Sequence, residues 1–118
     1  MKSDEFDSKK AREFLLRKER EEKEAQEQSR QNLLREISTI LRGEFEKTPV
    51  EVFLVGSILR PFAFTSSSDI DVVLKNYKGD RFEYWAQLER KIGRDVEIIL
   101  FETCTFQEFV LKDGLKVV

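Results

Sequence analysis

The sequence contains no histidine and only one cysteine, Cys104, among its 118 residues. Without histidine, the chain has no imidazole for general-base catalysis, for nucleophilic catalysis or for binding zinc. A single cysteine forms neither an internal disulfide nor a cysteine-rich metal site, so we expect Cys104 to be a half-buried apolar residue. Catalysis by this chain would therefore depend on carboxylates, hydroxyls and basic side chains.

The sequence also lacks an excess of either charge, because 21 lysines and arginines face 23 aspartates and glutamates, for a net charge of −2. Direct binding to nucleic acid is not expected, since no basic surplus is available to neutralise phosphates. No apolar signal segment follows the first methionine, and no stretch approaches the roughly 20 apolar residues that a membrane span needs. We therefore expect a soluble, cytoplasmic protein that does not bind a membrane.

Proline and glycine are scarce at the start, where residues 1–46 are predicted to form a long charged helix. Residues 9–46 contain no proline and only Gly43, and they are rich in strong helix formers. Residues 17–30 carry many charges and only Ala25 as an apolar residue, which indicates a solvated helix or one that needs a partner. An apolar stripe predicted to face a core follows at Leu33, Leu34, Ile37, Ile40, Leu41 and Phe45.

Residues 47–118 are predicted to form the second region, a small domain with a mixed sheet. Apolar and β-branched residues predict strands at residues 50–55, 69–75 and 95–101. Helices are expected between and after these strands, which makes the fold class α/β (α+β), with helices packed on the sheet and the long N-terminal helix attached.

Two helices are predicted in this second region from their capping residues. Asp80 with Glu83 is a plausible capping pair, and the helix that it begins is expected to end at Gly93. Its apolar face is predicted to consist of Phe82, Trp85, Leu88 and Ile92. Thr105 with Glu108 is typical of a capping box for a last short helix.

An apolar strand that ends in Gly56 and Ser57 offers groups that bind phosphate. Glycine lets the backbone approach an anion closely, the N–H groups that follow can point at it, and the serine adds a hydroxyl donor. Arg60 is a candidate phosphate contact. A simple turn and a solvated arginine are the alternatives at this point.

Asp69 and Asp71 are separated by one residue at the start of the second predicted strand, so both carboxylates lie on one face while Ile70 points into the core. Two such charges repel each other unless a cation lies between them, and Mg²⁺ prefers a few carboxylates together with water and phosphate oxygens. Two solvated aspartates at a strand end are the alternative reading.

A third carboxylate is expected from the third strand, where Asp95 and Glu97 share one face. Glu97 lies within the apolar run, where an unpaired carboxylate would be costly, which favours Glu97 as the ligand or base and Asp95 as an edge residue.

The segment from Phe53 to Arg60, followed by Ser68-Asp69-Ile70-Asp71 and its apolar continuation, resembles the DNA polymerase β-like nucleotidyltransferase superfamily. The closest likeness is to the minimal nucleotidyltransferases, including the antitoxins that are paired with HEPN toxins. Residues 93–99 look like the family's segment for the third acidic residue. One departure is Pro61, which stands where the family usually has a glycine.

The resemblance implies transfer of AMP from ATP to an acceptor hydroxyl, with two Mg²⁺ ions as cofactors. It implies that the metal is held by the carboxylates of Asp69, Asp71 and Glu97, which are also the catalytic residues. The residues that it places at the nucleotide are Gly56, Ser57, Arg60 and Ser68.

The acceptor implied by the same resemblance is a tyrosine of a partner HEPN toxin, which the protein would neutralise as an antitoxin. The small second region leaves no room for an acceptor-binding helical domain, which favours a protein partner, and homo- or hetero-oligomers are possible assemblies. Two alternatives remain open: an inactive antitoxin that acts by contact alone, and the catalytic subunit of a small-molecule nucleotidyltransferase.

Overall fold

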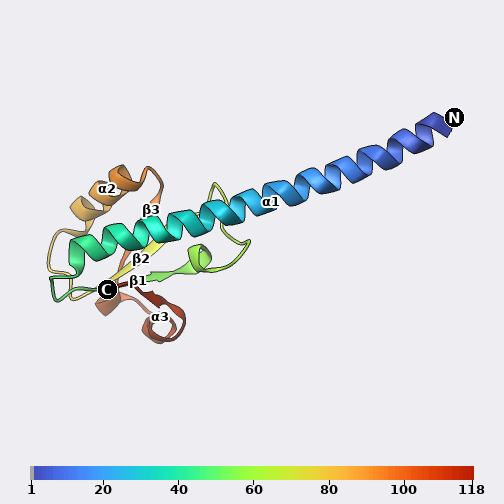
Figure 1. Ribbon diagram of the computed structural model, residues 1–118. Helices are drawn as coiled ribbons and strands as arrows, with labels where there is room; N and C mark the ends of the chain where they lie inside the picture. Colours follow the sequence, from blue (N-terminus) through green and yellow to red (C-terminus); the bar gives the residue numbers. More distant parts are fainter. Residues whose placement is uncertain (1) are drawn as a thin grey trace.

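The computed structural model describes residues 2–118, with side chains from Asp7 onward. Helix α1 (Lys2–Phe45) is a single long helix whose N-terminal half extends away from the rest of the chain (Figure 1). The side chains of residues 7–26 are all exposed to solvent. Further along, Ile37 and Leu41 are completely buried, which confirms the apolar stripe predicted for the second half of this helix.

Four strands form one mixed sheet, in the order β3-β2-β1-β4. Strand β1 (Glu51–Val55) is antiparallel to both β2 (Ile70–Lys75) and β4 (Leu115–Lys116), whereas β2 is parallel to β3 (Val96–Leu100). The predicted mixed sheet with helices packed on it is confirmed. Strand β4 was not expected, because two residues are too few to show the alternation by which a strand is recognised in a sequence.

Helices α1 and α2 (Arg81–Ile92) cover one face of the sheet, and α3 (Gln107–Asp113) covers part of the other (Figure 1). Because side chains alternate along a strand, Leu54 packs toward α1 and α2 while Val55 packs toward α3. The same alternation buries Ile70 completely, as predicted, and leaves the side chains of residues 69, 71 and 97 on the face that carries α3.

The predicted cap of α2 is confirmed, because the Asp80 side chain accepts hydrogen bonds from the backbone N–H groups of Phe82 and Glu83 at 2.9 and 3.2 Å. The predicted apolar face is wrong at Phe82, which is 67% exposed. Tyr84 occupies the buried face together with Leu88, four residues away, because residues with this spacing lie above one another on a helix. The Tyr84 hydroxyl donates to Glu44 at 2.7 Å, which satisfies its polar group in the core.

The capping box predicted at Thr105 is also wrong. Helix α3 begins at Gln107, and its N-cap residue, Phe106, provides no side-chain hydrogen bond. The Gln107 amide instead donates to the Phe101 carbonyl at 2.8 Å, so the start of α3 is tied to the end of β3 rather than capped locally. No helix within residues 2–118 has the length and apolar character required to cross a bilayer.

Candidate functional site

Asp71 and Glu97 are neighbours in the sheet, and each lies near the N-terminal end of its strand, β2 or β3. The parallel register pairs Asp71 with Glu97, and the antiparallel register pairs Asp71 with Val55 on its other side. Asp71 is half-buried and Glu97 is exposed. The strand that ends in Val55 therefore delivers the following residue, Gly56, directly to the Asp71 carboxylate.

Gly56 lies so close to Asp71 that only glycine fits between them. Its φ is +85°, a conformation that residues with a side chain rarely adopt. A Cβ atom at this position would lie 2.6 Å from the Asp71 Oδ2 atom, which is shorter than any normal contact. The close approach at Gly56 is therefore made to a carboxylate of the site, whereas the sequence led us to expect an approach to phosphate. The backbone turns there into the short 3-10 helix η1 (Gly56–Leu59).

Burial and the neighbouring carboxylates raise the pKa of Asp71 from its ordinary value of 3.8 to about 6. Burial is the main cause, followed by repulsion from Glu97 and then from Asp69, and the Glu97 carboxyl is also within hydrogen-bonding reach. A bound cation would remove both the repulsion and the cost of burying the charge. An all-oxygen donor set of this kind suits Mg²⁺.

Asp69, which was predicted as a metal ligand together with Asp71 and Glu97, does not form a closely grouped cluster with them. Within residues 2–118, no three side chains of the acidic, histidine or cysteine type are grouped closely enough to hold a metal ion together. Asp69 is exposed in the bend before β2, but it is near enough to raise the pKa of Asp71. The fit to a cation thus depends on the pair Asp71 and Glu97, with Asp69 as the adjacent carboxylate.

A groove of about 640 Å³ includes this pair and residues of β3 in its lining. Gly56, Asp71 and Glu97 all border it. The remaining lining is mostly apolar and aromatic and comes from β1, α2, β3 and the segment that leads into α3: Val55, Arg81, Trp85, Ile98, Ile99, Leu100, Thr103, Cys104, Thr105, Phe106 and Phe109. Nothing in the sequence pattern alone indicated that these elements share a groove.

The other predicted phosphate-binding residues lie outside the lining of this groove. Ser57 is half-buried in η1, where its carbonyl accepts a hydrogen bond from the Arg60 N–H at 3.0 Å. The Arg60 side chain is exposed. The Ser68 hydroxyl accepts a hydrogen bond from the Thr65 N–H at 3.0 Å and so serves its own loop. The structure therefore brings together Gly56, Asp71 and Glu97, but not Ser57, Arg60 and Ser68.

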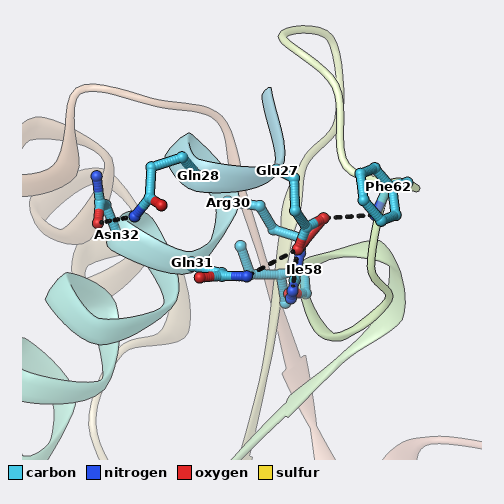
Figure 2. A network of polar contacts seen from close by, with 7 residues as sticks. All are labelled: Glu27, Gln28, Arg30, Gln31, Asn32, Ile58 and Phe62. Carbon is cyan, nitrogen blue, oxygen red and sulfur yellow. Dashed lines mark hydrogen bonds and ion pairs between the residues drawn. The ribbon is translucent and has the colours of Figure 1, made fainter. Parts of the chain in front are cut away.

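An ion pair of α1 holds the loop that follows the glycine, and sequence reasoning missed it (Figure 2). Glu27 and Arg30 are 8% and 7% exposed, although they lie in the segment predicted to have no buried face. Arg30 forms an ion pair with Glu27 and donates to the Ile58 carbonyl at 2.8 Å. The Glu27 carboxylate accepts a hydrogen bond from the Phe62 N–H at 2.6 Å.

These contacts connect α1 to both ends of the segment between Ile58 and Phe62. Phe62 has a φ of +63°, which is unusual for a residue other than glycine. Because its N–H donates to Glu27, the ion pair stabilises this turn as well as η1. No sequence signal marks this pair, because α1 contains many acidic and basic residues at the same spacing.

The ion pair makes the stability of the protein sensitive to acid. The hydrogen bond from Arg30, and then that from the Phe62 N–H, lower the pKa of Glu27 from 4.5 to about 2. A lowered pKa contributes stability that is complete above pH 4.5 and is lost as the pH falls toward 2. We expect the urea midpoint of the protein to fall between pH 4.5 and 2.5, and to fall less in Glu27→Gln. An equal decline in both proteins would show that other carboxylates dominate.

A second arginine, Arg94, orders the loop that carries Asp69. Its guanidinium donates to the carbonyls of Thr65 and Ser68 at 2.9 Å each, and it lies 4.5 Å from the ring centre of Phe64. Arg94 thereby fixes the loop immediately before the first aspartate, a role that sequence reasoning did not assign to it.

No family model, no curated protein and no solved structure matches this chain. The function is therefore inferred from the residues of the site and from the motif to which they belong.

Proposed function

We propose that the protein is a Mg²⁺-dependent nucleotidyltransferase that transfers AMP from ATP to an acceptor hydroxyl. The observation that supports this function best is the junction of Gly56, Asp71 and Glu97. A glycine without room for a side chain lies against a carboxylate whose ionised form is disfavoured, and a second carboxylate lies beside it. This arrangement suits the binding of a metal-bound triphosphate, because Mg²⁺ is typically held by one or two carboxylates together with phosphate oxygens.

In this proposal Asp71 and Glu97, with Asp69, would hold magnesium, which would neutralise charge on the triphosphate and lower the pKa of the attacking hydroxyl. The backbone at Gly56, which borders the groove, would lie beside the phosphates. The acceptor oxygen forms a bond to the α-phosphorus, and the bond from that phosphorus to the bridging oxygen of pyrophosphate breaks. The hydroxyl proton passes to the exposed carboxylate of Glu97, and pyrophosphate leaves.

The acceptor that we propose is a tyrosine of a partner HEPN toxin, so that the protein acts as an antitoxin by AMPylation. Residues 2–118 consist of one sheet, three α-helices and two short 3-10 helices, without a separate helical domain that would bind an acceptor. The exposed residues 7–26 of α1 extend away from the sheet and offer a surface by which such a partner is held (Figure 1).

Incubation with labelled ATP, Mg²⁺ and the product of the neighbouring gene tests this function. We expect label on a tyrosine of the partner, and no label when Asp71→Asn replaces the natural protein. Binding of the partner without any label would instead support an antitoxin that acts by contact alone. Label on a small acceptor in place of the partner would support the catalytic subunit of a small-molecule nucleotidyltransferase.

A further inference from the structure

Strand β3 lies at an edge of the sheet and pairs, within residues 2–118, with β2 alone. The Ile70 N–H of β2 donates to the Asp95 carbonyl at 3.1 Å. In a parallel ladder, alternate residues of a strand direct their backbone groups to the partner strand. Residues 95, 97 and 99 therefore bond to β2, whereas the backbone groups of residues 96, 98 and 100 point away from the sheet.

A contact at the start of β3 confirms this orientation. The Val96 N–H donates to the Glu89 carboxylate of α2 at 3.0 Å rather than to β2. Glu89 covers only this first position of the edge. At the other end of the strand, the Leu100 carbonyl accepts a hydrogen bond from the Thr103 hydroxyl at 3.4 Å. The N–H and carbonyl of Ile98 and the N–H of Leu100 remain as the part of the edge that a further strand would use.

This edge has few of the features that normally prevent strand addition. Protected edges carry lysine, proline, bulges or inward-pointing charges. The sequence of β3 is Val-Glu-Ile-Ile-Leu, and its single charge, Glu97, projects from the face of the sheet and belongs to the candidate site. The edge is thus apolar and open to pairing.

The groove described above runs along this edge. All four residues of Glu97–Leu100 line it. Because consecutive residues of a strand point to opposite faces of the sheet, a groove lined by all four must lie beside the edge of β3. On one face it is bordered by Arg81 and Trp85 of α2, and on the other by Phe106 and Phe109 near α3. An extended chain beside β3 would place its side chains alternately against these two groups.

We propose that the edge of β3 binds an extended polypeptide segment as a fifth strand and thereby presents its hydroxyl-bearing residue to Glu97 and Asp71. This inference rests on the proposed function and names the form in which the acceptor is recognised. Backbone groups give the affinity in this mode, and pockets for alternate side chains give the selectivity. An added strand lies about 4.8 Å from β3, so an aromatic hydroxyl on the α3 face would reach the carboxylates.

The charges of the groove favour a polypeptide over a nucleic acid as the occupant. Its charged lining residues are two carboxylates, Asp71 and Glu97, and a single arginine, Arg81. A polyanion would be repelled by this balance, whereas a peptide backbone matches the row of outward N–H and carbonyl groups.

The proposal is tested with a display library of eight-residue peptides that carry one fixed central tyrosine. The variant is Leu100→Pro, which removes one outward N–H at a residue whose φ of −88° is close to that of proline. Leu100→Ala is the matched control, because it shortens the same side chain and keeps the N–H. For selected peptides we expect affinity about tenfold weaker for Leu100→Pro than for Leu100→Ala. Methylating alternate backbone nitrogens of a peptide should weaken binding in an every-second-residue pattern.

Equal affinity of the two variants, or a library without any peptide that binds the natural protein, would overturn the edge-strand proposal. A second readout separates failure of the proposed function from failure of the edge-strand proposal. It is Mg²⁺-dependent ATP binding, measured for the natural protein and for Leu100→Pro. Peptide binding without ATP binding would refute the transferase and leave the edge intact. ATP binding by both proteins, with unchanged peptide affinity in Leu100→Pro, would refute the edge alone.

Discussion

Replacing Asp71 with asparagine is expected to abolish AMP transfer and, at the same time, to make the protein more stable. The carboxylate is the central group of the site, between Gly56 and Glu97, so its loss would remove a ligand of the proposed magnesium ion. We expect the rate of transfer to fall by on the order of 10²- to 10³-fold, as for other groups that stabilise charge in a transition state.

The gain in stability follows from the raised pKa of Asp71, which is about 6 rather than 3.8. A raised pKa contributes stability that is complete below pH 3.8 and is lost as the pH rises through 6, so at pH 7 the ionised carboxylate opposes folding. Allowing for its partial exposure to solvent, we expect Asp71→Asn to raise the free energy of unfolding by about 1 kcal/mol at pH 7. Urea unfolding at pH 4 and pH 7 measures this, and the gain should be smaller at pH 4.

Asp95→Asn is the matched control for this prediction. Asp95 is exposed just before β3. The substitution makes the same chemical change two residues away from Glu97. We expect it to leave both activity and stability near those of the natural protein. A loss of activity in Asp95→Asn comparable to that in Glu97→Gln would show that the third carboxylate had been assigned to the wrong residue.

Replacing Gly56 with alanine is expected to have the second-largest effect. The positive φ disfavours any side chain by roughly 1–2 kcal/mol, and the added Cβ would lie 2.6 Å from the Asp71 Oδ2 atom. Either the backbone or the carboxylate must therefore move. We expect unfolding at lower urea concentration, with a loss of about 2 kcal/mol, and AMP transfer reduced by roughly 10²-fold because displacements of this size disturb reacting geometry.

Gly43→Ala provides the control for the glycine substitution. Gly43 lies within α1, and a Cβ there would meet no atom within 4 Å. The same change should raise the stability by up to about 1 kcal/mol, because alanine favours the helix more than glycine does. A Gly56→Ala protein that is as stable and as active as the Gly43→Ala protein would contradict the close packing of Gly56 against Asp71.

The parts of the fold that follow from local periodicity could be predicted from the sequence. Alternation along β2 and β3 correctly indicated that Ile70 is buried while residues 71 and 97 share a face, and the helical spacing of Ile37 and Leu41 correctly indicated a buried stripe. These patterns depend only on neighbours in the chain. The grouping of Gly56 with Asp71 and Glu97 in one predicted site came from the resemblance to the nucleotidyltransferases and not from these patterns.

The parts that depend on distant contacts could not be predicted. Glu27 and Arg30 resemble the other charged residues of α1, and only the position of Ile58 and Phe62 in space explains why this pair is buried. The error at Phe82 has a similar cause. Tyr84 is buried in place of Phe82, and its hydroxyl donates a hydrogen bond to Glu44, forty residues earlier in the sequence. The groove, likewise, is built from elements that are separate in the sequence.

Calorimetric titration of a non-hydrolysable ATP analogue, with Mg²⁺ and with a chelator, tests the central claim that the pair of Asp71 and Glu97 beside Gly56 is a metal-nucleotide site. We expect binding by the natural protein only when Mg²⁺ is present, and affinity at least about tenfold weaker in Asp71→Asn, which is the loss expected for a charged contact of roughly 1.4 kcal/mol. Binding that is unchanged by the chelator or by Asp71→Asn, or no binding at all, would contradict this claim.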